Sequence, residues 1–334
     1  KFYGTVFFKK IFRTPVSFEK DMTSFIAFGG VNYKAWIWVN GKFIEAHERG
    51  YTSFKIDISD VIKETPGSEN QLVVAVDNSW GHDDWLPWVR QVDFFNYGGI
   101  HRSVELLILP RAYIADFTFF HDIEFDGKTP KVIPANLTVN FNNTLNSAVP
   151  TECIVKIVDD DNAEILQTTR KSFILQPTQE SGLNFTFNVD PAKIKLWSPS
   201  NPKLYILYIQ LLVEGVPVDA IEWKTGFRKF ETKGTEFFLN NKRIFMRGTN
   251  KHEDHPDFGL AMPDSLRYQD LVKMKNAHIN CFRGSHYPVA EGLLDACDEL
   301  GLLFIEEVAH WQVTGQQMKN PRLLDTALKY LDEM

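Results

Sequence analysis

Three side chains that could bind a polar ligand lie in the last third of the sequence. His252 follows one short apolar run. Arg283 is the last residue of another run at 279–283, and His286 follows that run. The guanidinium of Arg283 could clamp a carboxylate with two parallel hydrogen bonds. It could also form an internal salt bridge with Glu307, and the two roles are compatible. Each histidine could contact a ligand or only satisfy a loop carbonyl, so these residues are candidates for a binding site.

Two neighbouring clusters suggest other chemistry, but their spacing argues against it. The tetrapeptide His-Glu-Asp-His at 252–255 has histidines three residues apart on a loop, whereas the zincin pattern needs them four apart on a helix. Glu306 and Glu307 are adjacent on an expected strand, so their side chains point to opposite faces and cannot flank one bond. We therefore expect no metal site and no catalytic carboxylate pair here.

The segment that carries these residues alternates strand-like and helix-like patterns. The apolar runs cover 243–246, 279–283 and 302–307, and the helical stripes cover 264–277 with Asp264 as N-cap, 289–300 and 321–334. This order predicts three βα units of a parallel sheet. Parallel sheets are covered on both faces, and a closed (β/α)8 barrel takes about 250 residues. We therefore expect the N-terminal part of a TIM barrel over 225–334, and a chain that is a fragment of a longer protein.

The first two thirds of the chain have the period-2 patterning of β-strands. Clear strand-like runs are 36–39, 72–76, 104–109, 135–141, 153–158, 184–189 and 205–213. Asn40-Gly41 after the first run predicts a type I′ hairpin turn. Residues 112–224 have the strand spacing of an immunoglobulin-like sandwich. The stretch 79–99 is rich in aromatic residues, and such long loops usually have a function.

Composition excludes several classes of partner. The chain has 36 Lys and Arg against 43 Asp and Glu, a formal charge of −7. An acidic chain without a basic stripe argues against nucleic-acid and anionic-membrane partners. No apolar run reaches the ~18 residues of a membrane span. The three cysteines are too few and too widely spaced for a disulfide framework or a paired-cysteine metal site. We expect no cofactor.

Several motifs with fixed gaps extend these observations. They are 93–102 (DFFNYGGIHR), 196–199 (LWSP), 226–228 (GFR), 248–254 (GTNKHED), 280–288 (NCFRGSHYP) and 301–305 (GLLFI). Together they resemble glycoside hydrolase family 2, which includes β-galactosidases, β-glucuronidases and β-mannosidases. The resemblance covers nearly the whole chain. One departure is Gly284, where the family usually has Thr, Ser, Cys, Ala or Asn.

The resemblance implies a domain order that agrees with the patterning. We expect a jelly-roll sugar-binding-type domain over 1–111, an immunoglobulin-like β-sandwich over 112–224 and the first three βα units of the catalytic TIM barrel over 225–334. The tryptophans of the aromatic stretch (Trp80, Trp85 and Trp88) could pack a core or stack on sugars.

The resemblance also implies roles for single residues. His252, Arg283 and His286 are expected to bind substrate, and Glu307 to support them. Asp93 is expected to reach from the N-terminal domain to sugar hydroxyls, since an ionised carboxylate only accepts hydrogen bonds.

The activity implied is that of a retaining exo-β-glycosidase. Such enzymes use one glutamate as acid/base and another as nucleophile. In the resembling family both follow later barrel strands, so we expect them after Met334 and expect this chain alone to be inactive. The form of the 93–97 loop favours terminal β-glucuronides as substrates. A β-galactosidase or a non-catalytic carbohydrate-binding relative is the alternative. The expected partner is a carbohydrate, and a homo-oligomer is possible in this family.

Overall fold

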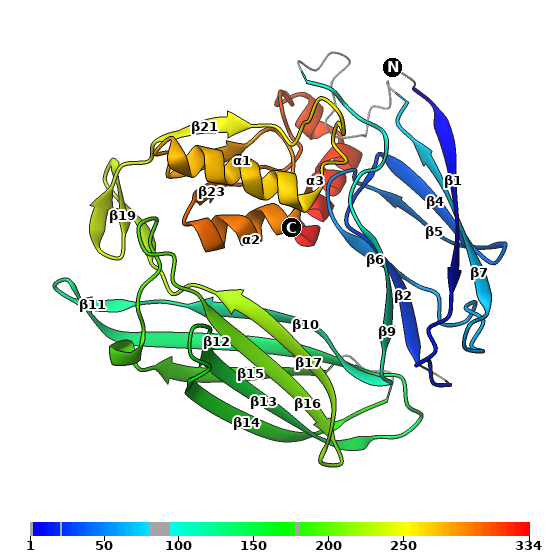
Figure 1. Ribbon diagram of the computed structural model, residues 1–334, viewed down its shortest axis with the longest axis horizontal. Coiled ribbons are helices and arrows are strands. Elements are labelled where there is room, and N and C mark those ends of the chain that lie inside the picture. The colour runs from blue at the N-terminus through cyan, green and yellow to red at the C-terminus, as the bar shows by residue number, and fades with distance from the viewer. Residues whose placement is uncertain (1–2, 21, 80–93, 178–180) are drawn as a thin grey trace. The chain divides into compact units, whose positions relative to one another are not determined.

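The computed structural model describes residues 3–20, 22–79, 94–177 and 181–334 (Figure 1). It divides into two compact units. The first combines Lys1–Ile108, Gly248–Ala296 and Phe304–Met334, and the second combines Leu109–Arg247 with Cys297–Leu303. Strands make up the first two thirds of the chain, and strands alternate with helices in the last third. The coarse architecture predicted from the sequence, β-rich domains followed by βα units, is confirmed.

The N-terminal part of the first unit is a sandwich of two main sheets. One has the order β1 (Thr5–Arg13), β7 (Glu69–Asp77), β4 (Lys34–Val39) and β5 (Lys42–Glu48), and the other β6 (Phe54–Asp57), β2 (Thr23–Phe28) and β9 (Val104–Leu109), beside a short pair of β3 (Val31–Asn32) and β8 (Gly99–Ile100). Ile37 and Val39 of β4 are fully buried and share one core with Ile26 and Phe28 of β2. The hydrophobic faces of the two sheets therefore enclose this core.

The hairpin predicted at Asn40-Gly41 is present between β4 and β5. Asn40 has φ 51° and Gly41 has φ 83°. Both central residues of a type I′ turn need positive φ, which these two residue types adopt at low cost. The turn is therefore confirmed.

The second unit contains a second sandwich. One sheet contains β10 (Ala112–His121), β11 (Glu124–Asp126), β12 (Thr129–Asn143) and β15 (Ser181–Val189), and the other has the order β14 (Ile165–Leu175), β13 (Val149–Asp159), β16 (Tyr205–Val213) and β17 (Val216–Thr225). A 3₁₀ turn, η1 (Pro191–Lys193), precedes β16. Alternate residues of β12 and β16, such as Leu137, Val139, Leu207 and Ile209, are completely buried in one core. This period-2 burial is what the sequence pattern predicts for a two-sheet sandwich.

The βα part begins one strand later than the sequence suggested. Residues 242–244 belong to β20 (Lys242–Ile244), which pairs antiparallel in a small sheet with β19 (Glu236–Leu239) and β18 (Phe230–Lys233). The first parallel strand is β21 (Gly248–Lys251), which pairs with β22 (Cys281–Gly284). The prediction that the run 243–246 is the first barrel strand was therefore wrong.

The close approach of two backbones explains this error. A Cβ atom at Gly248 would lie 2.3 Å from the carbonyl oxygen of Cys281 on the neighbouring strand. Glycine is therefore required where β21 begins, although in a single sequence it looks like a turn residue.

The remaining elements follow the predicted alternation. They are α1 (Asp264–Asn276), α2 (Glu291–Leu300), β23 (Leu303–Ile305), a 3₁₀ turn η2 (Gln317–Lys319) and α3 (Pro321–Glu333), with β23 beside β22 in the parallel sheet. The N-cap of α1 is Pro263, and Asp264 is the first helical residue. Among the described residues, no helix has the length and apolar character needed to cross a lipid bilayer.

A further core joins the N-terminal sandwich to the βα part within the first unit. It contains Tyr51 from the sandwich and Tyr287, Leu323 and Tyr330 from the βα part, all almost completely buried. The rings of Tyr51 and Tyr287 stack with centroids 4.1 Å apart. The hydroxyl of Tyr330 accepts a hydrogen bond of 2.8 Å from the amide of Gly50.

Glu333, at the end of α3, adds a charged contact to the same region. Its carboxylate accepts hydrogen bonds from Arg49 Nε at 2.8 Å and Arg49 Nη2 at 2.6 Å, and also contacts His47 and Thr52. Burial opposes ionisation of this group, but the hydrogen bonds from His47, Arg49 and Thr52 outweigh it and lower the pKa of Glu333 to about 2. The ionised form is therefore favoured in the folded protein.

Glu333→Gln should make the stability of the full-length protein less dependent on acid pH. A depressed carboxylate pKa stabilises the fold above the unfolded value and loses that effect as pH falls through the folded value. From the normal 4.5 to about 2 this corresponds to roughly 3 kcal/mol. Thermal unfolding should show a deficit of the variant at neutral pH that shrinks below about pH 4.5. A deficit that does not change with pH would contradict this account.

Candidate functional site

Arg283, His286 and Glu307 meet at the C-terminal end of the parallel strands. The Arg283 Nε donates to Glu307, and Arg283 Nη2 lies 3.2 Å from Nδ1 of His286. The same Nδ1 lies 3.3 Å from the second oxygen of Glu307. The Arg283–Glu307 salt bridge considered in the sequence analysis is therefore present. Both partners of this salt bridge lie near Nδ1 of His286. Nε2 of the same ring makes no hydrogen bond within the described part of the chain.

Aromatic rings surround His286. Its ring stacks on Trp311 with centroids 5.0 Å apart and meets the edge of His252 at 5.2 Å. The ring of Phe94, from the N-terminal part of the chain, lies 5.1 Å from His252 and 5.9 Å from Trp311. The two predicted histidines are therefore brought together, within a cluster that combines flat apolar faces with hydrogen-bonding groups.

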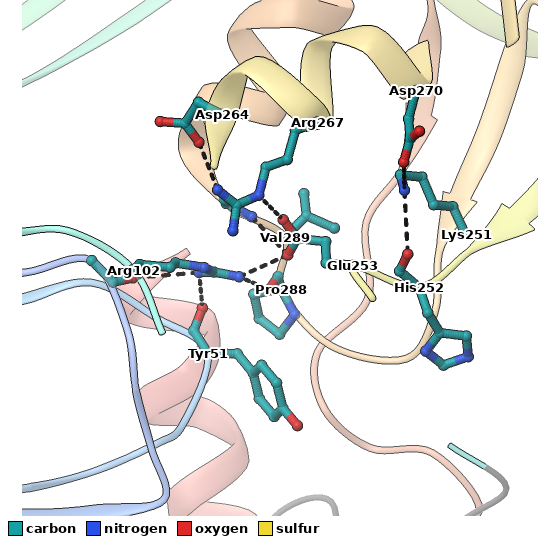
Figure 2. A network of polar contacts seen from close by, with 12 residues as sticks. Tyr51, Arg102, Lys251, His252, Glu253, Asp264, Arg267, Asp270, Pro288 and Val289 are labelled. Carbon is teal, nitrogen blue, oxygen red and sulfur yellow. Dashed lines mark hydrogen bonds and ion pairs between the residues drawn. The ribbon is translucent and has the colours of Figure 1, made fainter. Parts of the chain in front are cut away.

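His252 follows β21 directly, and its backbone is held by a neighbouring lysine. Lys251 Nζ donates to the His252 carbonyl at 3.3 Å and to Asp270 of α1 at 2.9 Å (Figure 2). Only 9% of the Lys251 side chain is exposed. This ammonium therefore ties the loop after β21 to the first helix.

Glu253 is the most buried charged residue near the site. Its side chain is 1% exposed and lies between Arg102 and Arg267, which are 8% and 4% exposed. Arg102 Nη2 donates to it at 3.0 Å and Arg267 Nε at 2.7 Å (Figure 2). The amide of Ala290 donates to it at 3.1 Å. Arg267 also pairs with Asp264 at 2.7 Å. A buried carboxylate needs such partners, because desolvation of an unpaired charge costs several kcal/mol.

Glu306 and Glu307 make separate contacts. Glu306 accepts a hydrogen bond of 3.3 Å from the amide of Val289, while Glu307 binds Arg283 and His286. Glu306 is exposed as a residue, but protein atoms displace water from its carboxyl group. This desolvation outweighs the Val289 hydrogen bond and the nearby Arg102 charge, and it raises the pKa of Glu306 to about 7.

The sequence found some of these residues and missed others. His252, Arg283, His286 and Glu307 were named and lie in one cluster. Asp93 and the tryptophans Trp80, Trp85 and Trp88 lie outside the described residues. The residues missed are Trp311 and Arg267, which had no motif signal. Phe94, Arg102 and Glu253 were part of motifs but had no assigned role.

The donor set does not resemble a metal centre. No group of three or more His, Cys, Asp or Glu side chains within the described ranges is arranged to hold a metal ion. What the cluster offers is a carboxylate acceptor, guanidinium and imidazole donors, and aromatic faces. This combination suits a polyhydroxylated ligand, whose hydroxyls need both donors and acceptors and whose ring carbons pack on aromatic faces.

Comparison with known protein families covers almost the whole chain. The sugar binding domain of glycosyl hydrolases family 2 matches residues 1–110, a second domain of the same family matches 112–228, and its TIM barrel domain matches 230–329. The chain belongs to glycosyl hydrolases family 2. The three matches follow one another in the order expected from the sequence.

Individual family 2 proteins agree with this assignment. A β-galactosidase of Thermoanaerobacterium thermosulfurigenes is 33% identical over 298 residues, which are 89% of this chain and 40% of that protein. The structure of Bacteroides uniformis β-glucuronidase 2, covalently bound to cyclophellitol-6-carboxylate aziridine, superposes with a TM-score of 0.89 at 26% identity, over 99% of this chain and 39% of that one. An Eisenbergiella tayi β-galacturonidase bound to galacturonate gives 0.85 at 28% identity, over 100% and 55%.

This family 2 chain thus spans between about two fifths and just over half of the proteins named above. Gly284, which departs from the residues usual at this position in the family, has a local explanation. A Cβ atom there would lie 2.7 Å from Cζ of Phe304 and 2.9 Å from Cγ1 of Val289. The Phe304 ring also packs on Phe282 with centroids 4.9 Å apart. The ring fills the space that a side chain at 284 would need.

Gly284→Ala should destabilise the protein by roughly 1–3 kcal/mol, the usual cost of forcing an extra methyl into a packed core. The lost stability should be partly recovered in the double variant with Phe304→Leu, which shortens the opposing side chain. Thermal unfolding of both variants and of Phe304→Leu alone measures this coupling. Additive effects of the two substitutions would show that the Phe304 ring does not limit the space at 284.

Proposed function

We propose that this chain forms the sugar-recognition part of a retaining exo-β-glycosidase that hydrolyses terminal β-glucuronides. The observation that carries the proposal is the cluster of Arg283, His286 and Glu307 at the strand ends of a family 2 barrel domain. In barrel enzymes the active site is built at this end of the strands. Carbohydrate is therefore the expected ligand.

Each residue of the cluster has a proposed role. His286 and His252 form hydrogen bonds to sugar hydroxyls through a ring nitrogen, and Asp93 accepts from such hydroxyls. Glu307 holds Arg283 and Nδ1 of His286, so that Nε2 of His286 faces the ligand. The rings of Phe94 and Trp311 pack against the sugar; both lie within 6.0 Å of the His286 ring, measured between centroids.

The catalytic glutamates are proposed to lie outside residues 1–334. A retaining glycosidase needs two carboxyl groups about 5–5.5 Å apart across the scissile bond, one as acid/base and one as nucleophile. Glu307 is committed to Arg283 and His286, and Glu306 accepts from Val289. Glu306 and Glu307 therefore do not form the catalytic pair. We propose that this chain alone is inactive.

Two family 2 structures support a uronide as the substrate. The Bacteroides protein is a β-glucuronidase and the Eisenbergiella protein a β-galacturonidase. Arg283 supplies a cation near the proposed site, but Glu307 already neutralises it. Most of the recognition of a sugar carboxylate would therefore come from groups elsewhere in the full-length protein.

A β-galactosidase is the second candidate, favoured by the 33% identity to the Thermoanaerobacterium enzyme. A non-catalytic carbohydrate-binding relative is the third. We further propose the domain limits 1–111, 112–224 and 225–334, with a jelly-roll topology in the first domain. The family matches that end near 110 and 228 support these limits.

The full-length protein should hydrolyse p-nitrophenyl β-glucuronide with a higher kcat/KM than the β-galactoside, and the β-galacturonide is measured beside them as a second uronide. A site built to pair a carboxylate rejects a neutral sugar because its own buried polar groups are left unpaired. Proton NMR should show the β-anomer as the first product, as expected for retention. A preference for the galactoside would select the second candidate, and binding without hydrolysis of any of the three would select the third.

His286→Ala in the full-length enzyme should fold and lose activity. Loss of a hydrogen bond to a charged or developing-charge group costs roughly 1.5–3 kcal/mol, or about 10- to 100-fold in kcat/KM. His255→Ala is a matched control from the neighbouring loop, because its ring packs on Phe258 with centroids 5.2 Å apart. Wild-type turnover by His286→Ala would contradict its proposed role.

A further inference from the structure

We propose that Arg102, in the N-terminal sandwich, is a positioning residue that holds the segment 286–290 and thereby sets the place of His286 in the site. The inference rests on the proposed function, since it assigns a further residue to the same sugar-binding wall. None of the described contacts of Arg102 involves Arg283 or Glu307. Its effect on His286 is therefore transmitted through the backbone of 286–290.

Three consecutive residues shortly after His286 are each held by an ionisable side chain. The carbonyl of Pro288 accepts from Arg102 Nη2 at 2.7 Å (Figure 2). The amide of Val289 donates to Glu306 at 3.3 Å, and the amide of Ala290 donates to Glu253 at 3.1 Å. The three side chains come from different parts of the chain. Together they fix the backbone two to four residues beyond the histidine.

Arg102 links two of these three contacts. Besides Pro288, the same Nη2 donates to Glu253 at 3.0 Å, and Nη1 donates to the carbonyl of Tyr51 at 2.6 Å. The ring of Tyr51 stacks on Tyr287, the residue next to His286, at 4.1 Å. The guanidinium therefore contacts both the chain that follows His286 and the residue whose ring supports Tyr287.

The chemistry of this position favours arginine. A planar guanidinium can serve several acceptors at once, whereas a lysine ammonium acts as a compact point charge. With 8% of its side chain exposed, Arg102 has little access to water that could replace these contacts. A change here should therefore move the segment 286–290 and not merely rehydrate it.

A second pair of the same type separates positioning from simple stability. Arg49 and Glu333 also join the sandwich to the βα part of the same unit, through two hydrogen bonds of 2.6 and 2.8 Å. None of the described contacts of Glu333 involves 286–290. Removing the Glu333 charge weakens the same junction without releasing the segment.

The test compares Arg102→Met, Arg102→Lys and Glu333→Gln in the full-length protein. Arg102→Met is expected to fold, because Glu253 keeps Arg267 and the Ala290 amide as partners. Displacement of a binding group by about 1 Å can lower the rate about 100-fold. We expect kcat/KM on p-nitrophenyl β-glucuronide, measured well below the unfolding temperature, to fall about 10- to 100-fold in Arg102→Met. Arg102→Lys should recover part of this loss, and Glu333→Gln should keep wild-type kinetics while its thermal midpoint falls.

A double-variant cycle identifies the route of the effect. If Arg102 acts through His286, adding Arg102→Met to His286→Ala should change kcat/KM by less than about twofold, because coupled residues are not additive. Full additivity of the two losses would overturn the proposal. So would Arg102→Met with wild-type kinetics and only a lowered thermal midpoint.

Hydrogen exchange followed by mass spectrometry tests the positioning without any substrate. Peptides that contain Val289 and Ala290 should exchange faster in Arg102→Met than in the wild type, and should be unchanged in Glu333→Gln. If the wild type hydrolyses none of the three glycosides, the proposed function fails, and the exchange result still decides whether Arg102 holds the segment. Unchanged exchange in Arg102→Met would overturn the inference.

Discussion

The first compact unit is organised around one buried carboxylate, that of Glu253. A carboxylate that is 1% exposed must recover the cost of losing its water from protein donors, and a buried charge left without partners would cost several kcal/mol. Here the donors come from the N-terminal sandwich through Arg102, from α1 through Arg267 and from the loop before α2 through Ala290. None of these segments can move far without exposing the charge.

This requirement places the loops that carry the candidate site. His252 precedes Glu253 in the chain, so the contacts of Glu253 fix the loop after β21, while Lys251 donates to the His252 carbonyl. The segment after His286 meets the same carboxylate through Ala290. The two histidines lie with ring centroids 5.2 Å apart. A single buried group thus determines the spacing between two loops that follow different strands.

The sequence predicted the bounds of strands and helices, which depend on local pattern. It did not predict contacts between residues far apart in the chain. β9 and β16 begin and end at the predicted residues, and α1 ends one residue early, because alternation and helical stripes are read within ten or so positions. Gly248 looks like a turn residue in the sequence, because the reason for a glycine at this position is the nearby carbonyl of Cys281 on another strand. Arg102 and Glu253 are 151 positions apart, and no periodicity connects such a pair.

The cluster at the strand ends illustrates the same difference for chemistry. Residue type alone allowed Arg283 to be either a free clamp for a carboxylate or one half of a salt bridge. In the structure Arg283 forms a salt bridge with Glu307, so the pair adds no net charge to the candidate site. A ligand carboxylate would gain little Coulomb energy from a pair that is already neutral. The pair therefore acts mainly through geometry. Arg283 Nη2 and a Glu307 oxygen both lie within hydrogen-bonding distance of Nδ1 of His286, so in either tautomer one of them holds the imidazole in this orientation. If the proposed function holds, these residues place the sugar ring, and discrimination between a uronide and a neutral sugar depends on further groups.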